Sequence, residues 1–284
     1  MKFLIVGDLH GQMPKIHFKE FDAIIAPGDF CSDKMKPLIW QAMREREKNP
    51  ECTLRWRDLA GKEKSHAMTE ESLADGRKIL EYLDTFGVPV YIVPGNWDWT
   101  GEDPDDLFFK RNRYPELFHG LKNVVDVHHR IVDAGGYNFI GYGISSAPEY
   151  LEGKQRFSRL KPEELADAKK EYNHKLRLIS SLFKKATKPV LFISHNVPFD
   201  TPLDLITNKD SVAYGQHYGS VVTRRIVEQY QPVVCIGAHM HEHFGKCKIG
   251  KTVCINAGFG SKVNTFLELE NGTIRQITFY PKVY

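Results

Sequence analysis

Five short motifs of metal-ligating residue types occur along the chain: Asp8-Leu9-His10, Gly28-Asp29, Gly95-Asn96-Trp97-Asp98, Ser194-His195 and Gly237-Ala238-His239-Met240-His241. Residues two apart in an extended chain point to the same side, so each Asp-x-His or His-x-His pair can reach one ion. Each motif is weak evidence on its own. The ordered set offers carboxylate, imidazole and amide ligands without thiolate, which predicts a centre for Mn²⁺, Fe or Zn²⁺.

Each motif directly follows a short apolar run of the kind that forms a buried strand. The runs cover residues 3–6, 23–26, 88–93, 189–193 and 232–236. Sheets of α/β proteins place their ligand groups at the carboxyl ends of strands. The sequence therefore predicts that the five motifs meet at one edge of such a sheet.

Helical spacing separates these strands over residues 70–86, 162–185 and 221–229, with Thr69 as a possible N-cap of the first helix. The chain then becomes β-rich over 245–255, 265–270 and 273–280, with turns at Gly250-Lys251 and Asn271-Gly272. This ending predicts an antiparallel meander and an α/β fold with a mixed sheet.

The segment 245–252 matches the expression for a phosphate-binding P-loop. That motif needs a helix beginning at its Lys-Thr pair. Here a strand pattern continues after Lys251, so the match predicts a hairpin turn and no nucleotide site. Cys247 and Cys254 would then face each other across the hairpin as two buried thiols.

The composition bounds the class of protein. A chain of 284 residues with 42% hydrophobic content is long enough for one large domain, which we place at residues 1–284. Residues 31–64, which include Trp40 and Trp56, and residues 148–160 are predicted insertions and candidate lids. The 39 basic and 36 acidic residues nearly balance, which favours neither nucleic acid nor membrane as a partner.

The same data predict the environment of the protein. The apolar run at residues 3–6 is too short for a signal peptide, and no run approaches the roughly 20 apolar residues of a membrane span. The five cysteines form no Cys-x-x-Cys pair, so a structural zinc site or a disulfide framework is not expected. We expect a soluble cytoplasmic protein.

The ordered motifs resemble the pattern of the calcineurin-like metallophosphoesterase superfamily, and the similarity is to its small single-domain phosphoesterases. It extends from Asp8 to about Gly260 and includes the sequence segments 195–204, 219–220 and 256–258. The resemblance implies a four-layer α/β/β/α sandwich with two mixed β-sheets. It implies two divalent metal ions, Mn²⁺ first, with Fe or Zn²⁺ as alternatives.

Position by position, the resemblance assigns the ligands. One metal would take Asp8, His10 and His241, the other would take Asn96, His195 and His239, and Asp29 would bridge both. The implied activity is hydrolysis of a phosphomonoester or phosphodiester, from a small molecule or a nucleotide, by a metal-bridging hydroxide. Asp29, Asn96, Asp98 and His195 are the implied catalytic residues.

Two subclasses are disfavoured by the residues themselves. After Asp29 the chain reads Phe30-Cys31-Ser32, without the phosphate-binding arginine of the protein Ser/Thr phosphatases. The near-neutral charge makes a DNA-processing nuclease a minority interpretation.

Trp97 departs from the family pattern, in which a histidine near the leaving-group oxygen follows the asparagine. An indole N–H cannot transfer its proton near neutral pH, and a positioned general acid contributes about 10²–10⁴-fold. The substrate would then carry a good leaving group or leave with help from metal or water, or His66 or His217 would donate the proton. The alternative is a non-catalytic metal-binding scaffold or interaction protein, which the retained ligand set disfavours.

Overall fold

The computed structural model describes residues 1–49, 51–102, 111–151, 161–211 and 213–282. Its strands form two six-stranded mixed sheets. The first has the order β12-β11-β1-β2-β3-β4, with strands β1 (Lys2–Ile5), β2 (Ala23–Ala26), β3 (Val90–Ile92), β4 (Val124–Asp126), β11 (Asn264–Glu270) and β12 (Thr273–Tyr280).

The second sheet has the order β5-β6-β7-β8-β10-β9. Its strands are β5 (Ile131–Ala134), β6 (Tyr137–Tyr142), β7 (Val190–Asn196), β8 (Val234–Ala238), β9 (Gly245–Ile249) and β10 (Thr252–Asn256). The helices are α1 (Lys36–Lys48), α2 (Trp56–Ala60), α3 (Lys62–Asp84), α4 (Pro162–Lys185) and α5 (Val221–Tyr230), with a 3₁₀ turn, η2, at Tyr114–Leu117.

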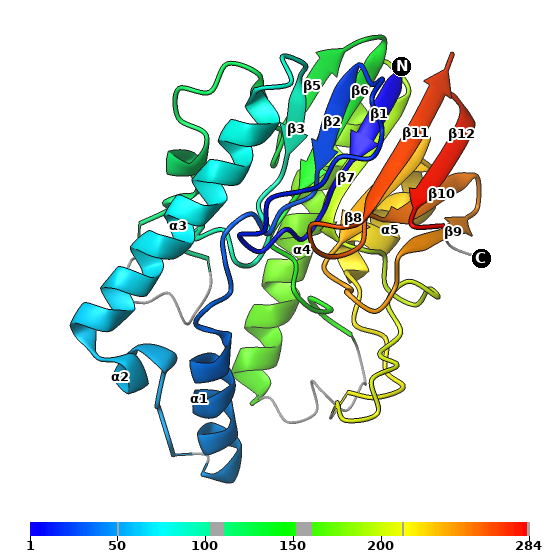
Figure 1. The fold of residues 1–284 in the computed structure, drawn as a ribbon. Helices are drawn as coiled ribbons and strands as arrows, with labels where there is room; N and C mark the ends of the chain where they lie inside the picture. Colours follow the sequence, from blue (N-terminus) through cyan, green and yellow to red (C-terminus); the bar gives the residue numbers. More distant parts are fainter. Residues whose placement is uncertain (50, 103–110, 152–160, 212, 283–284) are drawn as a thin grey trace.

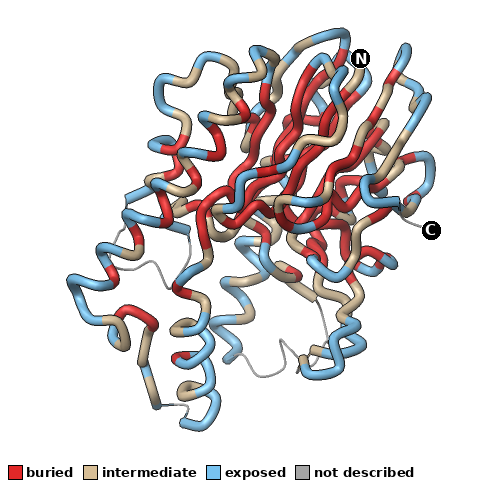
Figure 2. The backbone as a smooth tube through the Cα atoms, viewed as in Figure 1, coloured by how far each residue is buried: buried red, intermediate tan, exposed pale blue. Residues whose placement is uncertain are grey.

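The layers form because the central strands are apolar on both faces, as in sheets buried on both sides. Phe3 and Ile5 of β1 pack between the sheets against the inward face of the second sheet, whereas Leu4 packs on the opposite side beneath α3. Helices α4 and α5 cover the outer face of the second sheet in the same way. The predicted α/β/β/α sandwich is confirmed (Figures 1 and 2).

The prediction of a single C-terminal meander is wrong. Both predicted hairpins exist, but β9 and β10 extend the second sheet whereas β11 and β12 extend the first. Cys247 lies opposite Cys254 as predicted, but only Cys254 is buried and Cys247 is partly exposed. The chain crosses between the sheets after Asn256, and Gly260 donates its N–H to the Asp8 carbonyl at 2.9 Å on the way. The P-loop match is a hairpin turn, as predicted.

The helix predicted at 70–86 begins eight residues earlier, at Lys62. Thr69 does not cap it: its side chain is buried and donates to the Ser65 carbonyl one turn back, at 3.0 Å. Helix α4 has its predicted bounds, and α5 ends one residue later than predicted. Among the described residues, no helix has the length and apolar character needed to cross a bilayer.

Segment 31–64 folds into α1, α2 and the start of α3. Trp56 is buried there, as its aromatic character suggested, whereas Trp40 is 56% exposed. Residues 152–160 of the other predicted insertion lie outside the described residues. The division into one domain with two insertions stays a prediction.

Candidate metal centre

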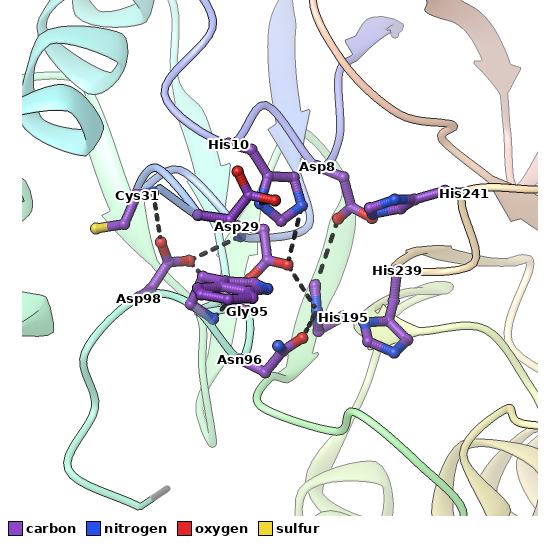
Figure 3. Close-up of polar contacts among 12 residues, drawn as sticks. Asp8, His10, Asp29, Cys31, Gly95, Asn96, Asp98, His195, His239 and His241 are labelled. Carbon is purple, nitrogen blue, oxygen red and sulfur yellow. Dashed lines mark hydrogen bonds and ion pairs between the residues drawn. The ribbon is translucent and has the colours of Figure 1, made fainter. Parts of the chain in front are cut away.

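The five motifs meet at the carboxyl ends of strands from both sheets (Figure 3). The first sheet supplies Asp8 and His10 after β1, Asp29 after β2, and the loop of Asn96 after β3. The second sheet supplies His195 within β7, and His239 and His241 after β8. Because both sheets end at the same place, the motif side chains converge although they are up to 233 residues apart in the sequence.

The backbone at this edge is strained. Asp8, His10, Asp29 and His239 all have left-handed φ values, between 45° and 65°. Non-glycine residues rarely adopt this conformation, which costs on the order of 1–3 kcal/mol each and clusters at functional sites. It turns each side chain out of its strand direction and into the cluster.

Two groups of side chains could each hold a metal ion. One is Asp8, His10 and His241; the other is Asp29, His195 and His239; within each group the potential ligand atoms lie within 4.8 Å of one another. Asp29 joins the groups, because its Oδ2 is 3.4 Å from His10 Nε2 and 3.6 Å from His195 Nε2. Asn96 adds a further oxygen, 3.0 Å from His195 Nε2.

The lone pairs in this cluster face one another, as they do around a cation. His195 Nδ1 lies 2.8 Å from the Pro27 carbonyl, to which it donates its proton in the neutral ring. That contact is typical of metal-ligating histidines. It leaves Nε2 with a lone pair directed at the oxygens of Asn96 and Asp29.

Several buried polar atoms in the cluster also lack a hydrogen bond. Within the described residues, both oxygens of Asp8, both ring nitrogens of His10 and Oδ2 of Asp29 form no hydrogen bond. Asp8 and Asp29 are 0% and 1% exposed. Buried carboxylates without compensation are costly, and metal coordination is one of the few ways to offset that cost. The donor set therefore fits two divalent cations.

Burial and neighbouring charges set the protonation states. Removal from water lowers the pKa of His10 to about 4 and that of His239 to about 3, so both are neutral and able to ligate at pH 7. Burial, with the charges of Asp8 and Asp98, raises the pKa of Asp29 well above its usual value. Burial would also raise the pKa of Asp8, but His241, His195 and His10 outweigh it and lower that pKa.

Asp98 is engaged by the backbone. Its Oδ2 accepts from the amides of Asp29 and Gly95, both at 2.8 Å, and its Oδ1 accepts from Phe30 at 2.8 Å and Cys31 at 3.0 Å. These bonds join the Asp29 loop to the Asn96 loop. Its predicted catalytic role stays a prediction.

Glycine makes this junction possible. A Cβ at Gly95 would lie 2.0 Å from Asp29 Oδ1 and 2.4 Å from the Asp29 nitrogen. Across the contact, a Cβ at Gly28 would meet the Gly95 nitrogen at 2.4 Å. Only glycine at both positions lets the two loops approach this closely.

Trp97 lies between the metal cluster and a cavity. Its backbone N–H donates to Asp29 Oδ1 at 2.8 Å, and its ring contacts His10 edge-on at 6.1 Å. It also lines a cavity of about 600 Å³ with Asn96, Trp56 and Trp99. Neither His66 nor His217 is among the described residues that line this cavity. His66 is exposed on α3, and His217 pairs with Asp204 at 2.8 Å.

Sequence reasoning missed several supporting groups. The Ser146 carbonyl holds His239 Nε2 at 2.9 Å, and the ring of Phe259 stacks on His241 at 4.0 Å. Glu149 accepts from the Val221 and Val222 amides and so fixes the start of α5. Backbone carbonyls leave no trace in residue type, and a lone aromatic after a motif cannot be told from a core residue.

Known proteins confirm the architecture. The model of the calcineurin-like phosphoesterase family matches residues 1–243, and no curated protein matches the chain. One solved structure is 16% identical with a TM-score of 0.62, covering 98% of this chain and 97% of the other. The crystal structure of TT1561 of Thermus thermophilus is 14% identical with a TM-score of 0.52, covering 97% of each chain.

At these identities the solved structures show the fold alone. The family match is independent of them and covers all five motifs. The chain therefore belongs to the calcineurin-like phosphoesterase family, whose members are metal-dependent phosphoric ester hydrolases.

Proposed function

We propose that the chain hydrolyses a phosphomonoester or phosphodiester at a binuclear centre. Asp8, His10 and His241 would hold one ion, and Asn96, His195 and His239 the other. The observation that carries this proposal is the place of Asp29, whose Oδ2 lies within 3.6 Å of histidine nitrogens from both groups. Asp29 would therefore bridge the two ions.

Two divalent cations at this place would acidify a water molecule and stabilise the charge that develops on phosphoryl oxygens. The protein's own part is positional. His195 is oriented by the Pro27 carbonyl and Asn96 lines the cavity, so both would fix where the ester binds. Mixed nitrogen and oxygen donors suit Mn²⁺, Fe or Zn²⁺, and we propose Mn²⁺ first, as the family resemblance implies.

The test is reconstitution with Mn²⁺, Fe²⁺ or Zn²⁺, followed by elemental analysis and assays with p-nitrophenyl phosphate and bis(p-nitrophenyl) phosphate. Two ions per chain and hydrolysis of at least one ester are expected. Asp29→Ala and His195→Ala should each bring the metal content below two ions per chain and lower kcat by about 10²-fold, since each removes a ligand. His66→Ala is the control, because His66 is exposed and outside the cluster.

Full activity in either ligand variant would refute the two-metal assignment. Two bound ions with no turnover on any ester would favour the scaffold. That outcome would make the chain a binding protein of the same fold.

A further inference from the structure

The cavity beside the metal cluster has a composition that the metal centre does not require. It adjoins the second ligand group at two points: Asn96 lines it, and so does Ser146, whose carbonyl holds His239 at 2.9 Å. Its volume of about 600 Å³ is within the range of small-molecule sites. A phosphoester bound at the cluster would extend its organic part into this space.

The walls are aromatic and held in place. Three of the four tryptophans in the chain line the cavity: Trp56, Trp97 and Trp99. Trp99 donates its ring N–H to Ser72 Oγ at 3.1 Å. The Arg57 guanidinium lies over Trp56 at 4.9 Å and over Trp99 at 5.6 Å, which fixes both rings by cation–π contact. Rigid aromatic faces are suited to stacking on a flat ring.

Among the described residues, the charged groups of the lining are mostly carboxylates, which disfavours a second phosphate. Lys175 is the only basic residue among the described residues that line the cavity, and it pairs with Glu171 at 2.6 Å. Glu149 and Glu102 add further carboxylates. A pyrophosphate or a distant phosphate group would meet like charge here. The cavity therefore favours an uncharged organic group.

Among the described residues, those of the lining next to the cluster offer no proton to a leaving group. Asn96 and Trp97 do not ionise near neutral pH, and the carboxylate of Asp98 accepts four backbone N–H groups. Glu149, further along the wall, accepts from Tyr142, Ser145 and Ser220. None of these described groups would supply a proton to a leaving oxygen beside Asn96 and Trp97.

We propose that the cavity binds the leaving group of an aryl phosphoester, a flat phenolic ring that departs as phenoxide; this inference rests on the proposed function. The oxygen of water bonds to phosphorus, the bond from phosphorus to the phenolic oxygen breaks, and its electron pair goes to that oxygen. The proton released from the water neutralises the phenoxide through solvent. Phenols ionise near pH 10, as tyrosine does, whereas aliphatic alcohols ionise near the value for water, about 15.7. Only the phenol leaves readily without an acid.

A matched pair of esters tests the leaving group. Phenyl phosphate and benzyl phosphate carry the same ring, but only the first has a phenolic oxygen. We expect kcat/KM for phenyl phosphate to exceed that for benzyl phosphate by at least about 10²-fold, the contribution of a general acid. Trp97→His should raise kcat on benzyl phosphate and shrink that ratio.

A binding measurement tests the walls independently of turnover. In a Trp40→Phe background, which removes the exposed tryptophan outside the cavity, the remaining tryptophan fluorescence comes from the three lining residues. Phenylphosphonate should quench this fluorescence in the Zn²⁺-loaded protein and bind about tenfold more tightly than methylphosphonate. Trp97→Leu should remove that preference while methylphosphonate binding persists.

The outcomes separate the two proposals. Benzyl phosphate cleaved within tenfold of phenyl phosphate, or equal affinity for the two phosphonates, overturns the aryl-ester inference and leaves the phosphoesterase function standing. If phenyl phosphate, benzyl phosphate, p-nitrophenyl phosphate and bis(p-nitrophenyl) phosphate all stay intact with each of the three metals, the proposed function is overturned and the inference fails with it. If bis(p-nitrophenyl) phosphate alone is cleaved, the phosphoesterase function stands and the aryl-monoester inference is overturned.

Discussion

Replacing Asp98 by asparagine tests whether this carboxylate positions the metal ligands or takes part in chemistry. The substitution keeps the shape of the side chain and exchanges one oxygen for an NH₂ group. Each oxygen of Asp98 accepts two backbone N–H groups, at 2.8–3.0 Å. Whichever way the amide turns, two buried donors lose their acceptor and face another donor.

The size of the effect follows from that geometry. An unsatisfied buried donor costs about 1–3 kcal/mol, so two cost about 2–6 kcal/mol. Part of this is offset, because a neutral amide does not carry the burial cost that raises the pKa of Asp98. We expect the free energy of unfolding to fall by about 2–4 kcal/mol, which leaves a typical domain folded. Metal affinity should fall too, because the hydrogen bonds that join the loops of Asp29 and Asn96 through this side chain are weakened.

Urea denaturation and metal titration measure both effects. Asp204→Asn is the matched control: Asp204 is also fully buried and accepts the amides of Asp200, Thr201 and Gly219, but it lies outside the cluster. It should lose similar stability and keep its metal affinity. If Asp98→Asn unfolds at the wild-type urea concentration, binds metal normally and yet loses turnover, the carboxylate acts in chemistry and our reasoning is wrong.

Two further perturbations probe the same cluster. Gly95→Ala should displace Asp29, because the new Cβ would lie 2.0 Å from its Oδ1, so metal content should fall on elemental analysis; Gly87→Ala, with no atom within 4 Å of its Cβ, should keep its metal. In the metal-free protein, His10 has a pKa of about 4 against 6.5 when unfolded. The unfolded chain therefore takes up the proton first, so the contribution of neutral His10 to the free energy of unfolding is complete above pH 6.5 and is lost as pH falls towards 4. The loss is on the order of 3 kcal/mol, and equal pH slopes of urea stability in wild type and His10→Asn would contradict it.

The convergence of the motif residues could be predicted from the sequence more readily than the pairing of the strands, for a physical reason; the roles of those residues stay predictions. The ligand loops are local: an apolar run followed by a carboxylate or histidine marks a strand end. The prediction of a single sheet edge is wrong, because three of the five ends belong to the first sheet and two to the second. Strand pairing is not local, so the crossing after Asn256 from one sheet to the other was not visible. Strands β4 to β6 were missed altogether, although Gly135-Gly136 between β5 and β6 is a strong two-residue hairpin signal.

Asp98 illustrates a second limit. A carboxylate after a strand can ionise, bind metal or accept backbone amides, and all three uses call for the same residue type. Only the three-dimensional arrangement shows four N–H groups around it. The cavity could not be predicted from the sequence either, because Trp56 and Trp97 come from segments about 40 residues apart and either could be an ordinary core residue.

Backbone strain and buried charge both make the metal cluster unfavourable for the folded state without metal. Ten non-glycine residues in the described part of the chain have left-handed φ; four lie in the metal cluster, and two, Trp99 and Ile144, line the cavity. Two carboxylates are also buried there without hydrogen bonds to all their oxygens. Neither feature stabilises the fold on its own, and both place ligand atoms where the sheets end. The cost becomes intelligible if a bound cation offsets it, so the fold and the metal centre should be coupled. Metal loading should raise the free energy of unfolding by an amount that grows with the logarithm of free metal concentration.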